Sequence, residues 1–366
     1  MSSVLRTRRS RWLVPVVLAG VIGLMALVPT LAAGAQSPSL APITPQALLE
    51  KVQAAHVDGL SGTIELTTNL GLPDLSALSG AVSGDRGGFN PVDLLAGMHS
   101  AQVWASDRGF KATYSDGPLS EDDVVATRHD VWTWQSQGQQ VTHLVLPAPS
   151  ATGKQTAPSP TPPTGEPVET PDQVASAILG AVAPSTDVTV GDTATVAGRA
   201  SYQLELRPRD ANSTVDHVAI AVDSDSGLPL RLQIFAKGQS KVALEFGFSS
   251  LDLSVPSAGT FTFTPPPGAQ VKTETVGGTH DASGPGGHNA SAPQTVGEAW
   301  GSVAIFEVGQ LPPQAGALSR MATPLPDGSG RLISTALVNV LLLDNGKVAV
   351  GAVSPAALEA AATSAH

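Results

Sequence analysis

The residues from Tyr202 to Phe263 constrain the fold most strongly, because apolar and polar side chains alternate along them. The alternation covers residues 202–207, 218–222, 230–235 and 242–248, and turns rich in Asp, Ser, Gly or Lys separate the four runs. A period of two places successive side chains on opposite faces of a β-strand. Such runs between turn residues predict an antiparallel meander with one buried and one solvated face. The apolar face must be covered by another element.

The composition favours a β-rich chain with long irregular segments. Hydrophobic residues make up 42% of the 366 residues but charged residues only 14%, and there are 37 Gly and 30 Pro. The chain has no Cys, which excludes disulfides, thiolate nucleophiles, zinc–thiolate sites and lipidation on Cys.

The first 35 residues predict export. Four arginines between positions 6 and 11 precede an apolar run from Trp12 to Val28, and residues 33–35 read Ala-Gly-Ala, a cleavage pattern. An uncleaved membrane anchor is the alternative, because the apolar run approaches spanning length. Cleavage would move the net charge from −11 to −15, with 16 basic against 31 acidic residues. We therefore expect an extracytoplasmic protein of the cell envelope, secreted or tethered, that binds no nucleic acid.

Capping residues predict a few short helices. Thr44 and Pro45 fit the N-cap and first position of a helix that ends before Gly59. Three more helices are expected over residues 90–98, 172–182 and 356–362.

The strands fall into two blocks, between residues 61 and 146 and between residues 188 and 263. We predict a mainly β (α+β) fold, in which a strongly curved, unclosed antiparallel sheet, a half-barrel, carries a few helices on its concave side. The expected half-barrel covers residues 45–271, with a Pro/Thr/Ser-rich linker at about 147–171.

The C-terminal part is expected to be a separate extension. A Gly-rich linker over residues 272–296 precedes a strand, a hairpin and a helix within residues 297–366. The hairpin is predicted around Asn345 and Gly346, because Asn-Gly between apolar runs is the strongest short-range hairpin signal.

No catalytic or metal-binding motif stands out. The chain has no G-x-S-x-G elbow, no P-loop and no H-E-x-x-H pair, so we expect a non-enzyme without cofactor or metal. Residues 121–123, Glu-Asp-Asp, are expected to form a solvated turn. Asp223 and Asp225 are expected to form a turn by accepting hydrogen bonds from nearby backbone.

The tryptophans allow two interpretations. Trp132 and Trp134 share one face of a strand, and Trp104 lies on another strand of the same block. Their rings either pack in a core under a helix or line an apolar cavity that takes a guest chain. The expected helices are few for covering both blocks, which favours a cavity. The candidate ligand-binding residues are Trp104, Trp132, Trp134, Leu204, Leu206, Ile220, Leu232, Ile234, Leu244 and Phe246.

Several phrases of the sequence carry a family resemblance. They include Gly59-Leu-Ser-Gly-Thr-Ile-Glu65, Asp130-Val-Trp-Thr-Trp134 and Val222-Asp-Ser-Asp-Ser-Gly-Leu-Pro-Leu-Arg231. From roughly Pro45 to Val271 the chain resembles actinobacterial proteins of the LolA type, which are related to the periplasmic lipoprotein carrier and to the sensor domain of RseB/MucB. The resemblance implies a bent, unclosed sheet plugged by helices and an apolar pocket that shelters acyl chains.

Two functions follow as hypotheses. The first is an exported carrier of lipid or lipoprotein acyl chains. The second is an RseB-like envelope regulator that binds an anti-sigma factor or another membrane partner, a role that the possible anchor and the C-terminal extension favour. A hydrolase is the least favoured, because no nucleophile–base pair can be named.

Overall fold

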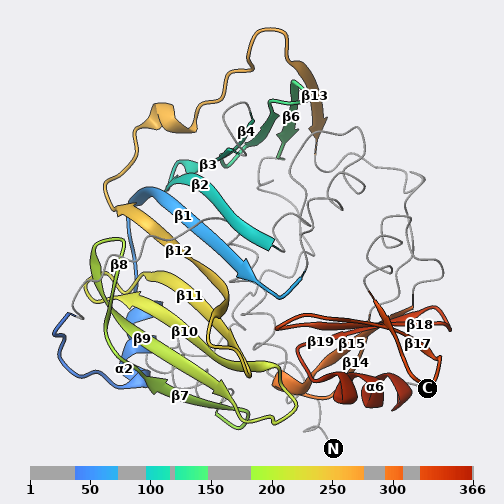
Figure 1. The fold of residues 1–366 in the computed structure, drawn as a ribbon. Helices are drawn as coiled ribbons and strands as arrows, with labels where there is room; N and C mark the ends of the chain where they lie inside the picture. Colours follow the sequence, from blue (N-terminus) through green and yellow to red (C-terminus); the bar gives the residue numbers. More distant parts are fainter. Residues whose placement is uncertain are drawn as a thin grey trace, which may run out of the picture.

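The computed structural model describes residues 38–72, 96–115, 120–146, 183–275, 293–307 and 322–364. These residues form a large sheet of thirteen strands and a small sheet of six, with two α-helices among them (Figure 1). Residues 1–37, the segment 147–171 and the predicted helix at 172–182 lie outside this range.

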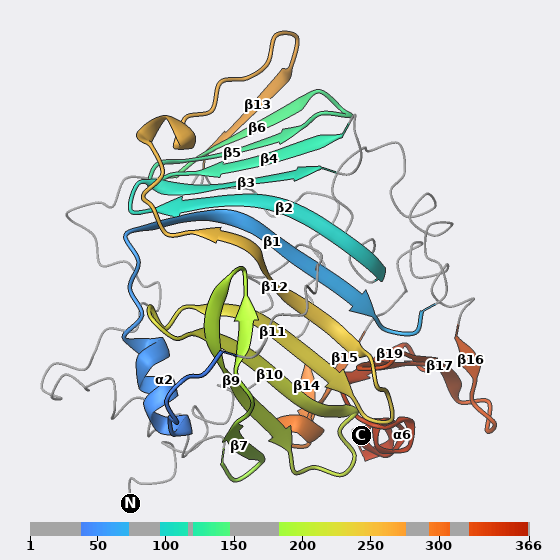
Figure 2. The ribbon, with the colours of Figure 1, turned by 60° about the vertical axis from the view of Figure 1, so that its left-hand side comes forward.

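The large sheet is unclosed, because β7 and β13 end it on opposite sides (Figures 1 and 2). Its order is β13-β6-β5-β4-β3-β2-β1-β12-β11-β10-β9-β7, with β8 paired to β9. The pairs are antiparallel except β13–β6, which is parallel. The strands are β1 (Gly59–Asn69), β2 (Ala96–Ser106), β3 (Gly109–Ser115), β4 (Glu121–Ala126), β5 (Asp130–Gln135), β6 (Gln140–Val145), β7 (Thr186–Val190), β8 (Ala194–Val196), β9 (Arg199–Pro208), β10 (Val215–Asp223), β11 (Pro229–Ala236), β12 (Val242–Asp252) and β13 (Gln270–Thr275).

The curved, mainly β architecture predicted from alternation is confirmed, and the two blocks of strands form one sheet. β1 joins them, because it pairs with β2 on one side and with β12 on the other. β13 returns to the far edge and extends to Thr275, into the segment predicted as a linker.

Helix α2 (Pro45–Gln53) begins as its capping residues predict. The backbone N–H of Ala47 donates to Oγ1 of Thr44 at 3.2 Å, and Pro45 takes the first turn, where no N–H partner is needed. The expected helix at 90–98 is wrong at its end. Met98 belongs to β2, where it pairs with Thr67 and is 58% exposed, because pairing of β2 with β1 along eleven residues overrides a local helical pattern.

The C-terminal unit, residues 293–307 and 322–364, forms the small sheet and helix α6 (Pro355–Ser364). The turn at Asn345 and Gly346 joins two paired strands as predicted, and Gly346 has a φ of 80°. The small sheet has the order β14-β15-β19-β18-β17-β16, and its strands are β14 (Gln294–Val296), β15 (Val303–Glu307), β16 (Thr323–Pro324), β17 (Gly330–Ser334), β18 (Asn339–Leu343) and β19 (Lys347–Gly351).

Backbone hydrogen bonds fix the C-terminal unit to the large sheet. The N–H of Ala336 donates to the carbonyl of Leu70 at 2.8 Å, and the N–H of Ser354 donates to that of Asn212 at 2.7 Å. The unit therefore docks on β1 and on the entrance of β10 rather than extending the edge of the large sheet (Figure 1).

Candidate functional site

The register of the large sheet assigns its side chains to two faces. Residues directly opposed in an antiparallel pair point to the same side. Leu66 opposes Phe246, and Phe246 opposes Leu232, in a row that continues through Ile220 to Leu204. We call this side the aliphatic face.

The other side carries the tryptophans and is called the tryptophan face. Trp104 opposes Ser61, which lies an odd number of residues from Leu66 on β1 and so points to the opposite side. The row continues through Lys111 and Val125 to Trp132, and Trp134 lies two residues further along β5. The structure therefore does not bring all ten candidate residues together. The three tryptophans lie on one face and the seven others, all on even positions of β9–β12, lie on the other.

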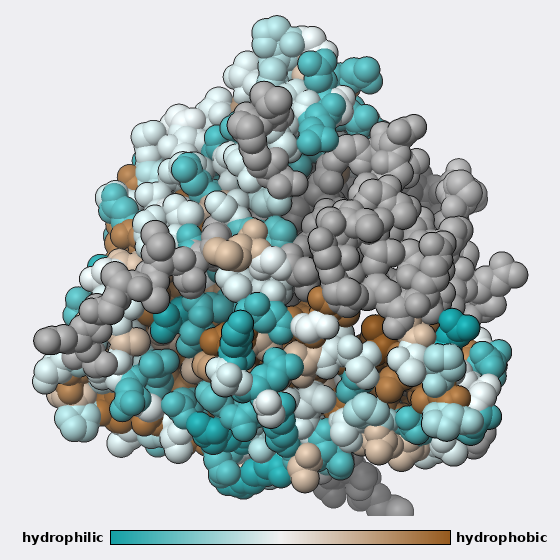
Figure 3. Space-filling view, in the orientation of Figure 1, coloured by the Kyte–Doolittle hydropathy of each residue, from teal (hydrophilic) through white to brown (hydrophobic). Residues whose placement is uncertain are grey.

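Helix α2 covers one part of the aliphatic face. Leu48 is fully buried and packs with Leu204 and Val222, while Leu206 and Ile220 lie at the border of this cluster. In Figure 1, α2 lies behind β9 and β10. The surface over these strands that faces the viewer is mainly hydrophilic, as expected for the opposite face (Figure 3).

The C-terminal unit covers the next part of the aliphatic face. Trp300 and Leu337, both buried, join a core cluster with Leu232, Ile234 and Phe246, against which Leu244 also packs. The indole N–H of Trp300 donates to Oγ1 of Thr186 at 2.7 Å, which satisfies its polar atom inside the core.

Further along the sheet, apolar side chains of the aliphatic face are exposed. Phe110 on β3 and Val124 on β4 are 42% and 38% exposed. Phe110 lies in a row with Ala126, Val131 and Leu144, and the last two are partly buried. We call Phe110, Val124, Val131 and Leu144 the open stripe.

The tryptophan face over β3–β6 combines aromatic and polar contacts. The ring of Trp132 stacks on His143 with centroids 3.7 Å apart, and His143 lies 2.7 Å from a carboxylate oxygen of Asp130. Phe263 approaches Trp132 from the chain segment after β12, with centroids 5.5 Å apart. Trp132 therefore packs in a mixed layer of aromatic and polar side chains.

The acidic residues 121–123 do not form the predicted solvated turn. They are part of β4, and Asp123 is buried beside the tryptophans. Its carboxylate accepts a hydrogen bond from Thr113 at 2.6 Å and lies 3.7 Å from Nζ of Lys111. That ammonium also lies 5.5 Å from the ring centroid of Trp104. These contacts satisfy the buried carboxylate, and across the described ranges no group of acidic or imidazole side chains is arranged to hold a metal ion.

The turn predicted at Asp223 is confirmed. The buried carboxylate of Asp223 accepts hydrogen bonds from the backbone N–H and hydroxyl of Ser226 and from Nε and Nη2 of Arg199, at 2.6 to 2.9 Å. Burial by itself would raise the pKa of Asp223, but the hydrogen bonds from Arg199 and Ser226 outweigh it, so the pKa lies below its ordinary value. The role of this carboxylate is to hold the β10–β11 turn.

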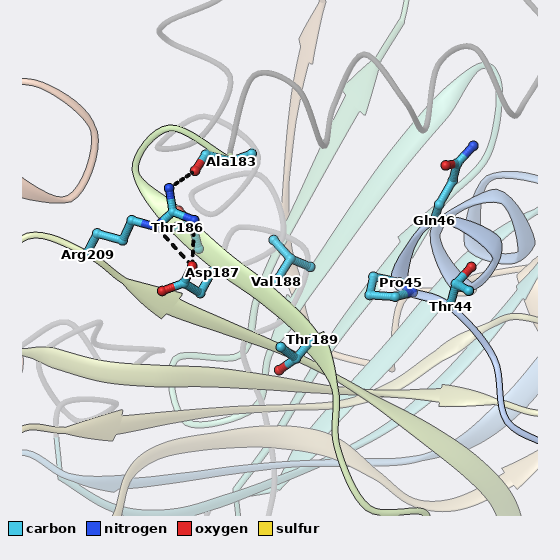
Figure 4. A pocket seen from close by; sticks show the side chains of 9 residues that line it. All are labelled: Thr44, Pro45, Gln46, Ala183, Thr186, Asp187, Val188, Thr189 and Arg209. Atoms are coloured by element: carbon cyan, nitrogen blue, oxygen red, sulfur yellow. Dashed lines mark hydrogen bonds and ion pairs between the residues drawn. The ribbon is translucent and has the colours of Figure 1, made fainter.

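A cavity of about 580 Å³ lies between the start of α2 and strand β7 (Figure 4). Arg209 closes one end, where its guanidinium donates to Asp187 at 2.9 Å and to the carbonyl of Ala183 at 2.7 Å. The hydrogen bond from Arg209 lowers the pKa of Asp187. The lining residues are Thr44, Pro45, Gln46, Ala183, Thr186, Asp187, Val188, Thr189 and Arg209.

The sequence analysis did not predict this cavity. Thr44 and Pro45 were recognisable as a helix start, and the residues around Val188 as a strand. Their meeting depends on packing between segments more than 130 positions apart, for which the local pattern gives no signal.

Comparisons with solved structures find similar folds. The chain resembles a MucA/MucB complex structure from Pseudomonas aeruginosa with 16% identity and a TM-score of 0.43, covering 87% of this chain and 96% of that one. An uncharacterised conserved protein from Thermus thermophilus has 12% identity and a TM-score of 0.33, covering 63% and 98%. A LolA superfamily protein from Nitrosomonas europaea has 12% identity and a TM-score of 0.22, covering 61% and 99%.

These likenesses concern the fold alone. No family model and no curated protein matches the chain. Within the described ranges, no helix has the length and apolar character needed to cross a membrane.

Proposed function

We propose that the protein is an exported, non-enzymatic binding protein of the cell envelope, and that its partner is a segment of a membrane protein. The observation that supports this most directly is the packing of the aliphatic face over β9–β12. There, α2 and the C-terminal unit bury the side chains that an acyl chain would need, including Leu204, Leu232 and Phe246. The cavity between α2 and β7 combines apolar surface, from residues such as Pro45 and Val188, with hydroxyl, amide and charged groups, and such a mixed lining suits a peptide.

The C-terminal unit has a stabilising role in this proposal. Its Trp300 and Leu337 complete the core of the large sheet, and its backbone is hydrogen-bonded to β1 and to the entrance of β10. The sheet can then act as a rigid platform, so that binding costs little ordering of the protein itself.

Affinity capture from the cell envelope tests the proposal. The full chain without residues 1–35 serves as bait, and a single-span membrane protein should be recovered reproducibly. Reciprocal capture with that protein as bait, followed by native mass spectrometry of the purified complex, should give a defined stoichiometry without a lipid adduct. Failure to recover any such protein in both directions would refute the proposal.

A lipid carrier is the second candidate, and the open stripe is the observation that favours it. Phe110 and Val124 expose apolar surface on the same face that would line a half-barrel. If this surface holds acyl chains, Phe110→Ser should weaken binding of a fluorescent fatty acid to the full chain. Phe306→Ser, at a comparably exposed Phe of the C-terminal unit, should not. A lipid-free mass from the membrane fraction and no fatty-acid binding would eliminate this candidate.

A further inference from the structure

Strand β7 presents a row of main-chain donors and acceptors at the edge of the large sheet. In an antiparallel pair, residues alternate between those bonded to the neighbouring strand and those that point away from it. The N–H of Arg209 donates to the carbonyl of Ser185, and that of Gly191 donates to Gln203, in the register of the β7–β9 pair. The odd positions of β7 therefore bond to β9, and Thr186, Val188 and Val190 point their N–H and C=O groups outward. Thr186 is buried and bonded to Trp300, so Val188 and Val190 carry the accessible outward groups.

No described strand pairs with those outward groups, since β7 ends the order of the sheet. The cavity lies along this edge. Its lining includes four consecutive residues, Thr186 to Thr189, and consecutive residues of a strand can line one cavity only when it runs along the backbone edge. The start of α2 forms the opposite wall, with Thr44, Pro45 and Gln46 (Figure 4).

The other edge of the sheet has a different character. β13 is almost fully exposed, and Lys272 and Glu274 form an ion pair along it at 2.6 Å. Charged side chains on an exposed edge strand are a common protection against pairing with other chains. At β7, by contrast, the edge adjoins the cavity and pairs with no strand of the described residues, and Asp187 and Arg209 form an ion pair at the end of the cavity.

We propose that the edge of β7 binds an extended segment of the partner protein as an added strand of the large sheet. This inference rests on the proposed function, in which the partner is a protein. Main-chain hydrogen bonds to Val188 and Val190, which are partly exposed, supply affinity, and the cavity walls supply specificity, as in other cases of strand addition.

The walls indicate which side chains the added strand carries. On the side of α2 it meets Val188, which packs in the Leu48 cluster, together with Pro45. On the other side it meets Asp187 and Thr189. We therefore expect small apolar residues to alternate with uncharged polar residues in the bound segment.

A single substitution tests the hydrogen-bonding capacity of the β7 edge. Val188→Pro removes an outward N–H while leaving the bonds between β7 and β9, since proline is tolerated where the N–H of an edge strand faces away from the sheet. Val271→Pro is the matched control on β13. The N–H of Gln270 donates to Gln139 in the parallel ladder, so that of Val271 points away from β6.

The experiment uses phage-displayed random linear peptides panned on the full chain without residues 1–35. Synthetic versions of the enriched peptides are then titrated by fluorescence anisotropy. Val188→Pro should weaken binding by about tenfold, the equivalent of one lost hydrogen bond, and Val271→Pro should leave it unchanged. Hydrogen exchange on the unsubstituted protein gives a second readout, in which peptide should slow exchange at Val188 and Val190.

Three outcomes would overturn the inference. They are the absence of enriched peptides, equal binding to the Val188→Pro variant, and unchanged exchange along β7 in the unsubstituted protein. A dimer that sediments as such and dissociates in the Val188→Pro variant would assign the edge to a second copy of the chain instead. If the Val188→Pro variant still captures the envelope partner, the proposed function stands and the site lies elsewhere.

Discussion

The two halves of the large sheet have the same alternation but different surroundings. In the closed half, β1 and β7–β12, the aliphatic face is buried under α2 and the C-terminal unit. In the open half, β2–β6 and β13, the same face exposes Phe110 and Val124, and the tryptophans lie on the opposite side. The difference shows that a strand's pattern identifies its apolar side, whereas the elements packed on that side decide whether it is core or surface.

The largest difference in the free energy of unfolding is expected between removal of Trp300, which packs on the closed half, and removal of Trp134 in the open half. Trp300 is 8% exposed and fills the core of the closed half, so Trp300→Ala should lower the free energy of unfolding by about 3–5 kcal/mol. Trp134→Ala, at a partly exposed ring of the open half, should cost less than half as much. Urea unfolding measures both, and a loss for Trp300→Ala well below this range would mean that the C-terminal unit contributes little to the closed core.

Each half of the sheet contains one buried aspartate, Asp223 in the closed half and Asp123 in the open half, and their substitution by Asn compares the two halves. Asp223→Asn should lower the free energy of unfolding by about 1.5–3 kcal/mol, because it disrupts the paired hydrogen bonds from Arg199 to a buried carboxylate. Asp123→Asn should cost less, since an amide oxygen can still accept from Thr113 and the contact with Lys111 is longer. Asp225→Asn, at an exposed side chain of the same turn, is the control and should change little.

The pH dependence of this effect has a definite sign. The pKa of Asp223 is lowered in the folded protein, so its contribution to stability is complete above the ordinary carboxyl pKa of about 4. The contribution disappears as the pH falls through the lowered value. The stability difference between the unsubstituted protein and Asp223→Asn should therefore be constant near neutrality and narrow below about pH 4. A difference that widens on acidification would contradict this assignment.

Substituting two glycines by Ala tests how closely α2 packs on the closed half. Gly198 and Gly227 have φ values of 76° and 75°, but a Cβ at Gly198 meets open space while one at Gly227 would collide with the carbonyl oxygen of Lys51 on α2. Gly198→Ala should cost about 1 kcal/mol for its left-handed backbone alone. Gly227→Ala should cost more, because α2 must also shift. Thermal unfolding compares them, and similar values would place α2 more loosely on the sheet.

The smallest effect is expected for Val124→Thr, and the same change at the buried Val218 is its counterpart in the closed half. Val124→Thr, in the open half, should alter the free energy of unfolding by no more than about 0.5 kcal/mol, as for other surface substitutions. Val218→Thr, at a fully buried position of the closed half, should cost about 1–3 kcal/mol, because the hydroxyl is buried among aliphatic groups. A substantial loss at Val124 would mean that the open stripe is covered in solution.

Local features of the fold were predictable from short stretches of sequence. The alternating runs after Tyr202 became β9–β12, Thr44 and Pro45 began α2, and Asn345 and Gly346 turned a hairpin. Each depends on the dihedral preferences of a few adjacent residues or on the alternation of side chains along one strand, so no distant contact was needed.

The candidate site was predictable only in part. Leu204 and Phe246 do share an apolar face, but Trp104, Trp132 and Trp134 lie on the opposite side of the same sheet. The sequence shows which residues of one strand share a face. Which faces of two neighbouring strands lie on the same side of the sheet depends on their register, and a shift of one residue moves every side chain to the other side. The pairing of β1 with both β2 and β12 fixed that relation.

By itself, then, the sequence determined that this chain is rich in strands, which residues form them and which side of each strand is apolar. The tertiary structure decided that the two blocks share one sheet, that α2 and the C-terminal unit bury the aliphatic face of the closed half, and that β7 is left as an edge beside α2. The physical reason is the range of the interactions. Alternation and turn preferences act between neighbours, whereas burial and edge exposure depend on contacts between segments more than a hundred residues apart.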